Sequence, residues 1–219
     1  MCPPHHRPHF SAWEREHAHV DWGGARSTSE VRSNLRPGQR ILDAGCGKGR
    51  YLLPLVDSYD ICGTDVSLIA LHAAKERLTR RNRDAPLMAS SITHLPLTER
   101  SFDAILCYGV MQHLLAEERH EAAAEFERVL APGGLVFFEA FGIQDMRYGG
   151  KMVEQDTFLR QNGVIYHYFT KEEVAVLFGN FEAVEIRDTI REKRFRGRPY
   201  LRHMVNAVFR LPDQNAMLR

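Results

Sequence analysis

From residue 40 onward, the chain alternates short apolar runs with segments whose apolar positions repeat at helical spacing. The apolar runs predict five strands, near residues 40–44, 60–64, 86–90, 103–108 and 134–140. Helical spacing predicts three helices, near residues 49–57, 67–80 and 117–130. Strands that alternate with helices in this way are typical of a parallel sheet with crossover helices. The pattern therefore predicts an α/β fold.

The pattern changes after the fifth predicted strand. Residues 141–169 are too long for an ordinary connection, and long insertions of this kind are often functional lids. Thr170 is then placed to cap a predicted helix over residues 171–178. Two further strands are predicted near residues 181–188 and 203–210. We expect them to pair antiparallel and to close the sheet.

A glycine-rich segment follows the first predicted strand. That strand ends in Asp43, and Gly45, Gly47 and Gly49 follow at alternate positions before a helical pattern begins. A tight glycine turn between a strand and a helix lets the backbone approach a ligand closely. Asp65 lies 20 residues after Gly45, at the end of the next apolar run. Because an acid at that place usually holds ribose hydroxyls, the sequence favours a nucleoside-binding site.

Four motifs in this order resemble the class I methyltransferases that use S-adenosylmethionine (SAM). The first two are the alternate-glycine turn with its acid and the acid that ends the second strand. The third surrounds the fourth strand, with a Leu-Pro-Leu run at residues 95–97 followed by residues 101–105 and 110–114. The fourth is the turn into the fifth strand at residues 128–134. The resemblance covers residues 41–138, and it implies a Rossmann-like, seven-stranded, mostly parallel sheet with helices on both faces and an antiparallel last strand.

The resemblance also implies which residues bind SAM and its product S-adenosylhomocysteine. Asp43 would orient the glycine turn or meet the ammonium group, and Asp65 would accept hydrogen bonds from both ribose hydroxyls. Ser91 stands where many relatives place an Asp that binds the adenine amino group, so it would make a weaker contact. Asp65 also has a second interpretation, as a cap of the helix that begins at Ser67. The expected cofactor contacts are Asp43, Gly45, Cys46, Gly47, Gly49, Asp65, Val66, Ser91, Ile92 and Cys107.

Methyl transfer from the sulfonium of SAM is an in-line displacement, and positioning of the acceptor can supply much of its acceleration. His113 and Tyr108 follow the fourth predicted strand, where this fold opens its cleft. We expect these two candidate catalytic residues mainly to position the reactants, because a base is needed only if the acceptor must lose a proton before attack.

Acceptor recognition is expected from the insertion, where Arg147, Tyr166 and His167 are the candidates. An equally open interpretation makes them surface residues or residues that stabilise a lid. Trp22, beside two glycines, is either a packing anchor at a turn or part of an N-terminal lid over the cofactor. The Pro- and His-rich residues 1–10 are expected to be disordered and not to bind a metal.

Composition adds few constraints on partners. The chain has 219 residues and a net charge of +1, which gives no general attraction to nucleic acid or membranes. It has neither an apolar run long enough to span a bilayer nor the apolar core of a secretory signal at its N-terminus. Its 4 cysteines show no C-x-x-C spacing and are expected to be reduced in a cytoplasmic protein. The basic, aromatic-containing run at residues 191–202 could contact RNA, but we expect a solvated hairpin loop, with contact to an anionic acceptor as a second idea.

The favoured function is methylation of a small molecule by a single domain. We expect a domain over residues 40–211, preceded by a tail and helical cap at 1–39 and followed by a tail at 212–219. Residues 46–52 resemble tRNA wobble-uridine methyltransferases, so a tRNA or protein acceptor is the alternative. Residues 167–210 loosely resemble small tellurite- and thiol-type methyltransferases. A third alternative is a non-catalytic SAM-binding module, and the oligomeric state stays open.

Overall fold

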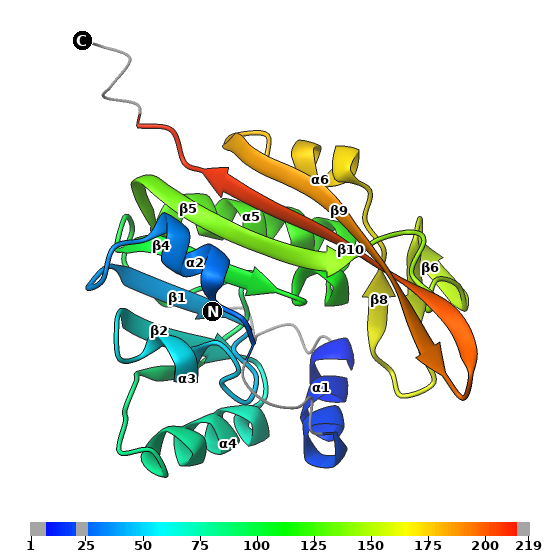
Figure 1. Ribbon diagram of the computed structural model, residues 1–219, viewed down its shortest axis with the longest axis horizontal. Helices are drawn as coiled ribbons and strands as arrows, with labels where there is room; N and C mark the ends of the chain where they lie inside the picture. Colours follow the sequence, from blue (N-terminus) through cyan, green and yellow to red (C-terminus); the bar gives the residue numbers. More distant parts are fainter. Residues whose placement is uncertain (1–7, 21–25, 214–219) are drawn as a thin grey trace, which may run out of the picture.

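The computed structural model describes residues 8–20 and 26–213, and a seven-stranded sheet forms its centre (Figure 1). The strand order is β3-β2-β1-β4-β5-β10-β9. The first five strands in this order run parallel, and β10 pairs antiparallel with both of its neighbours. The strands are β1 (Arg40–Ala44), β2 (Asp60–Asp65), β3 (Leu87–Ala89), β4 (Phe102–Tyr108), β5 (Leu130–Phe141), β9 (Glu182–Phe195) and β10 (Arg198–Arg210). The predicted fold class is confirmed.

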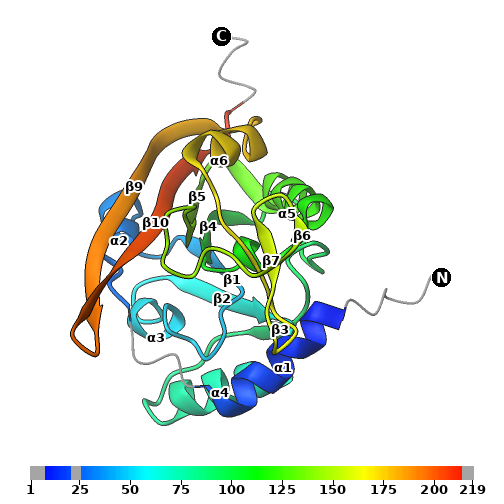
Figure 2. The same cartoon turned by 90° about the vertical axis from the view of Figure 1, so that its right-hand side faces the viewer.

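Helices cover both faces of this sheet because successive strand residues point to opposite sides. Ile41 packs in a core with residues of α2 (Ser29–Asn34) and α3 (Leu52–Leu55), whereas its neighbour Leu42 packs in a second core with α5 (Ala116–Val129) and α6 (Lys171–Leu177). Figure 2 shows α2 and α3 on one side of the sheet and α5 on the other. No helix in the described part of the chain is long and apolar enough to cross a membrane.

The helix after β2 begins and ends close to its predicted bounds. This helix, α4 (Leu68–Thr79), begins after Ser67, whose hydroxyl accepts a hydrogen bond from the Ala70 amide at 3.1 Å. The predicted cap at Thr170 is likewise present, with its hydroxyl accepting from the Glu173 amide at 3.1 Å. The helix predicted over residues 49–57 is shorter, because Gly49 has a φ of 79°, which an α-helix cannot contain.

The insertion at residues 141–169 folds into a second, three-stranded antiparallel sheet. Its strands are β6 (Lys151–Glu154), β7 (Thr157–Leu159) and β8 (Ile165–His167). β8 lies against the 3₁₀ turn η1 (Met111–His113) that follows β4. Helix α1 (Pro8–His19) packs against α4, so residues 8–10, which were expected to be disordered, begin a helix, and residues 1–7 lie outside the described residues. The insertion and α1 thus flank the ends of the central strands.

The prediction of a solvated hairpin loop over residues 191–202 is wrong, because most of these residues belong to β9 and β10. β9 and β10 pair from Glu182↔Arg210 to Phe195↔Arg198, with one register shift between Val208 and Phe209. A two-residue turn of Arg196 and Gly197 joins them, and both have a positive φ, of 48° and 77°. Two successive positive φ values match the twist of a hairpin, so the strands continue to the turn. β10 pairs with β5 only from Met204 onward, so the basic half of the hairpin projects beyond the central sheet.

The close approach of β2 to the glycine turn gives a first prediction. A Cβ on Gly63 would lie 2.8 Å from Cys46 Sγ and 3.1 Å from Leu52 Cδ1. We expect Gly63→Ala to lower the free energy of unfolding by about 1–3 kcal/mol, because the core cannot expand freely. Urea unfolding would measure this loss in the natural background and in a Cys46→Ala background, where the thiol is gone. The loss should be smaller in the second background, and equal losses would contradict a clash with Cys46.

Candidate functional site

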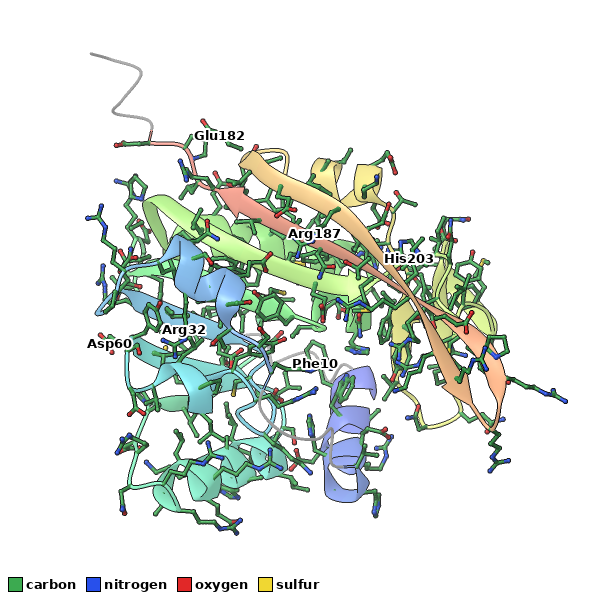
Figure 3. The ribbon with its side chains drawn as sticks, viewed as in Figure 1. Phe10, Arg32, Asp60, Glu182, Arg187 and His203 are labelled. Carbon is green, nitrogen blue, oxygen red and sulfur yellow. The ribbon has the colours of Figure 1, made fainter. Side chains whose placement is uncertain are left out.

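A cavity of about 950 Å³ opens at the carboxyl ends of β1, β2, β4 and β5. Parallel strands place these ends at one edge of a sheet, which is where α/β folds bind ligands. α1, β8 and the β9–β10 hairpin complete its walls, and Phe10 of α1 lies between that helix and the sheet (Figure 3). The predicted site residues that line the cavity are Asp43, Gly45, Cys46, Gly47, Asp65, Val66, Ser91, Ile92, Tyr108, His113, Arg147 and Tyr166.

The glycine turn is held by hydrogen bonds that use its own backbone. The amides of Gly45 and Cys46 both donate to Thr64 O at 2.8 Å. Gly45 has a φ of 79°, and a Cβ there would lie 2.4 Å from a methyl carbon of Val110. Only glycine accommodates both the left-handed backbone and this close contact. The turn therefore presents bare backbone to the cavity.

Asp65 joins the glycine turn to α4. Its Oδ2 accepts from the Gly47 amide at 2.8 Å, and its Oδ1 accepts from the Ser67 amide at 2.9 Å. The carboxylate is 8% exposed and lines the cavity. Ser67 itself caps α4, and Asp65 fixes the backbone of that capping residue; the contact of Asp65 with ribose hydroxyls stays a prediction.

Asp43 is a buried acid, 3% exposed. Among the residues that the structure describes, its Oδ2 has no hydrogen-bond partner. Burial, reinforced by the nearby Asp65 carboxylate, raises the pKa of Asp43 to about 8. A buried carboxylate oxygen that faces a cavity is best satisfied by a cation with N–H donors, which is the chemistry of the SAM ammonium group. The residues present therefore fit the methionine end of SAM.

The expected adenine end of the cavity is formed by Val66, Ser91 and Ile92. Ser91 Oγ shares a hydrogen bond with Thr93 Oγ1 at 2.8 Å and accepts from the Thr93 amide at 3.2 Å. The hydroxyl thus already holds its own turn, which leaves it less capacity to accept a bond from adenine than the Asp of many relatives has.

Two residues expected to contact the cofactor do not reach the cavity. Cys107 is fully buried in the core beneath α5, and burial raises the pKa of its thiol to about 12. Alternation along β4 explains this, because the next residue, Tyr108, points into the cavity instead. Gly49 is the second residue that does not line the cavity. A Cβ at this position would meet Ala74 of α4 at 3.4 Å, so this glycine allows α4 to pack closely against the turn.

His113 is held at both ring nitrogens. Its Nδ1 lies 2.9 Å from Ile165 O, and a carbonyl can only accept, so Nδ1 carries the hydrogen. Its Nε2 then accepts from the Gln112 side chain at 3.1 Å. Gln112 Oε1 in turn accepts from the Phe141 amide at 2.9 Å. This network favours a positioning role for His113 over that of a general base.

Aromatic rings line the wall beside His113. Trp13 of α1 packs edge-on against His113 with ring centroids 4.4 Å apart, and Tyr166 packs against its other side at 4.7 Å. Phe141 stacks on Tyr166 at 5.8 Å. Trp22, the predicted lid residue, lies outside the described residues, whereas Trp13, which the sequence reasoning did not single out, borders the cavity. The wall suits a flat apolar acceptor.

His167 does not reach this wall. It is 2% exposed, its Nδ1 bonds Thr157 Oγ1 at 2.8 Å, and its Nε2 bonds Glu173 Oε1 at 2.8 Å. Neighbouring strand residues point to opposite faces, so the position of Tyr166 at the cavity places His167 on the far side of β8. His167 joins the insertion to α6, and its assignment to the acceptor site is corrected.

Polar residues missed by the sequence reasoning line the opposite wall. Tyr108 Oη donates to Glu30 Oε2 at 3.3 Å, and Arg187 of β9 donates to Glu30 Oε1 at 3.1 Å. Burial, assisted by Glu30, raises the pKa of Tyr108, so this phenol stays protonated at neutral pH. Asn206 bonds Glu139 Oε2 at 3.0 Å at the end of β5. Glu139 could have been predicted to line the cavity from its place late in the fifth strand, whereas Glu30 lies outside every sequence motif.

His17 of α1 lies over the glycine turn. It is 7% exposed, and its ring lies 3.6 Å from where a Cβ of Gly47 would be. Its Nδ1 has no hydrogen-bond partner in the described part of the chain. Burial lowers its pKa and the Asp65 carboxylate opposes that shift. Lys48 Nζ also donates to Val20 O at 2.9 Å just after α1. α1 therefore covers the methionine end of the predicted cofactor site.

No metal site accompanies this arrangement in residues 8–20 and 26–213. Within these ranges, no three His, Cys, Asp or Glu side chains gather in positions that could hold a metal ion. The cavity chemistry there is that of carboxylates, aromatic rings and arginines.

The raised pKa of Asp43 predicts a pH-dependent affinity for S-adenosylhomocysteine, which carries the same ammonium group as SAM. Below pH 8 the acid is mostly protonated, and binding of the ammonium requires its ionised form. Affinity should therefore rise several-fold between pH 6 and 7, by at most about tenfold, with proton release on binding. Calorimetry in two buffers of different ionisation enthalpy measures both the affinity and the number of protons released on binding. Asp43→Asn should bind weakly and lose the proton release; an unchanged release would exclude Asp43 as its source.

Comparisons with known proteins agree with this geometry. Residues 42–138 match the family model described as a methyltransferase domain. A SAM-dependent methyltransferase of Methanosarcina mazei superposes with a TM-score of 0.72 at 24% identity, covering 84% of this chain and 98% of that one. A 1,6-didemethyltoxoflavin-N1-methyltransferase of Burkholderia thailandensis superposes with a TM-score of 0.70 at 20% identity, covering 97% and 94%.

One curated relative is a tRNA methyltransferase, whereas the Burkholderia neighbour is named for a small molecule. A tRNA N(3)-methylcytidine methyltransferase of Drosophila melanogaster is 25% identical over 195 residues, which are 81% of this chain and 60% of that protein. The chain thus spans less than two thirds of that relative. The matched segment, residues 42–138, contains the glycine turn, Asp65 and the fourth and fifth strands that form the cavity. Residues 42–138 are therefore a methyltransferase domain of the class I, SAM-dependent kind.

Proposed function

We propose that this chain transfers the methyl group of SAM to a small-molecule acceptor by in-line displacement. The observation that carries the proposal is a single cavity with two chemically different ends. One end has the glycine turn with Asp43 and Asp65, and the other has the aromatic wall of Trp13, His113 and Tyr166. A cofactor and a small acceptor would meet between them.

The cofactor end would hold SAM by charge and by close backbone contact. SAM supplies a methyl group that its sulfonium has already activated. Asp43 Oδ2 would accept from the ammonium group, the bare backbone of Gly45 and Gly47 would lie along the methionine end, and Asp65 would face the ribose. Asp65 already bonds two amides, so ribose hydroxyls would share its remaining lone pairs.

The acceptor end would act by positioning. Both ring nitrogens of His113 are engaged, and the phenol of Tyr108 stays protonated beside Glu30. Neither side chain is free to remove a proton in this arrangement. These residues would hold the acceptor against the activated methyl group and keep water out, which is sufficient for displacement at a sulfonium.

Two observations support a small acceptor over a nucleic acid. Side chains of α1 and β8 both line the acceptor end of the cavity. The Burkholderia neighbour, whose structure contains 1,6-didemethyltoxoflavin, matches the fold over nearly the whole chain. The tRNA acceptor remains the second candidate because the Drosophila relative is a tRNA methyltransferase and the hairpin end is basic.

A product-linked screen tests this function. Purified protein with SAM would be offered thiols, amines, phenols, carboxylic acids and a small tRNA, with release of S-adenosylhomocysteine as the readout. We expect turnover with a small molecule. Turnover only with tRNA, together with RNA binding that weakens steeply with salt, would establish the second candidate. Binding of SAM without turnover across the panel would favour a non-catalytic module.

Asp65 gives a sharper prediction for the cofactor end. Asp65→Ala should weaken SAM binding at least tenfold, about 1.4 kcal/mol, because it removes the ribose acceptor and loosens the Gly47 amide. Calorimetry measures the change. Ser67→Ala is the matched control, since it removes the cap of the same helix and costs about 1 kcal/mol of stability while leaving the carboxylate in place. Equal losses of affinity in both variants would assign the effect to α4 alone.

A further inference from the structure

Two arginines from distant segments converge on one ring at the acceptor end of the cavity. Arg147 follows β5 and Arg202 lies on β10, near the point where the hairpin passes the end of β5, as the position of His203 shows (Figure 3). Their guanidinium carbons lie 4.9 Å and 5.4 Å from the centre of the Phe141 ring. Both side chains line the cavity. Two cations therefore share one aromatic platform beside the acceptor wall.

Only one of these two charges is compensated. Arg202 Nε donates to Asp145 Oδ2 at 2.7 Å, and the Asp145 side chain is fully buried. The other oxygen of Asp145 accepts from the backbone amide of Arg147 at 3.1 Å, so it is used as well. Within residues 8–20 and 26–213, the guanidinium of Arg147 makes no hydrogen bond or ion pair. The group formed by these three residues thus carries one positive charge in excess.

Arg147 differs in this respect from Arg187, another arginine of the cavity. Arg187 is paired with Glu30 at 3.1 Å and with Glu185 at 2.8 Å. Arg147 is half-buried, and desolvation together with the charge of Arg202 lowers its pKa. A half-buried guanidinium that no carboxylate pairs keeps its N–H donors for an anionic ligand.

The backbone of Arg147 is fixed, so its side chain starts from a defined place. The Tyr168 hydroxyl donates to Arg147 O at 2.6 Å, and Arg160 donates to the same carbonyl. Tyr168 itself is fully buried. With this backbone fixed and the guanidinium lying over the Phe141 ring, the side chain is positioned to bind an anion through two parallel N–H donors.

We propose that the methyl acceptor carries a carboxylate or phosphate group and that Arg147, with Arg202 beside it, binds that group. This assignment rests on the proposed function, because it names the acceptor of the same cavity. The aromatic wall would hold the body of the acceptor while Arg147 fixes its anionic end. A carboxylate and a phosphate ester can each accept two parallel N–H donors from a guanidinium, and the test separates them.

The test measures binding to full-length protein saturated with S-adenosylhomocysteine, so it does not depend on turnover. The probes are benzoate, phenyl phosphate and the neutral analogue benzamide, measured by calorimetry. We expect at least one of the two anions to bind at least tenfold more tightly than benzamide, and the tighter of the two identifies the group. Equal binding of anion and neutral analogue, or no binding of either anion, would overturn the proposal.

Variants then assign the binding to Arg147. Arg147→Met, which keeps the length of the side chain, should weaken binding of the preferred anion at least tenfold, and Arg147→Lys should retain part of it. Arg198→Met, on the exposed end of the hairpin, should leave it unchanged. Affinity for S-adenosylhomocysteine should stay within twofold in all three, which shows that each variant is folded. Unchanged anion binding in Arg147→Met would overturn the assignment.

Two other outcomes have distinct meanings. Failure to bind S-adenosylhomocysteine at all would defeat the proposed function before any anion is tested. If the small anions do not bind but a small tRNA does, and Arg147→Met and Arg198→Met weaken it equally, the arginines serve an RNA backbone and the small-anion proposal fails.

Discussion

The carboxylate of Asp65 is the interaction on which the rest of the site depends. It accepts from the Gly47 amide and from the Ser67 amide, so one side chain fixes both the glycine turn and the start of α4. α1 packs on α4, and His17 of α1 lies over that same turn. Moving this carboxylate would loosen the turn, the helix and the cover together. The acid thus organises the cofactor end before any ligand arrives.

A second constraint is the alternation of side chains along each strand. On β4, Tyr108 reaches the cavity and Cys107 lies in the core, and on β8, Tyr166 reaches it and His167 does not. In each pair, one residue lines the cavity and its neighbour in sequence packs on the other face of the strand. The cavity is therefore built from every second residue at the strand ends, and the residues between them hold the walls in place.

Much of the fold and the cofactor end could be predicted because their signals are local. The spacing of Asp43, the glycines and Asp65 defines a turn and two strand ends whatever surrounds them. The face of a short strand is not local information, which is why Cys107 and His167 were assigned to the site. His17 is brought to the cavity by a helix that packs on α4, and no motif marks it. The length of the hairpin depends on a two-residue turn with two positive φ values, which the basic composition of residues 191–202 concealed.

The two ends of the cavity are also electrostatically incomplete in opposite senses. Within the described ranges, a buried oxygen of Asp43 is unsatisfied at one end, and the guanidinium of Arg147 has no anionic partner at the other. A cationic cofactor matches the first, and an anionic acceptor matches the second. Because Arg147 would repel the cationic ammonium of the cofactor, this polarity would favour one arrangement of the two ligands, with the methyl group between them. Orientation would then follow from charge placed by distant parts of the fold, and the side chains between the two ends need only fix distance.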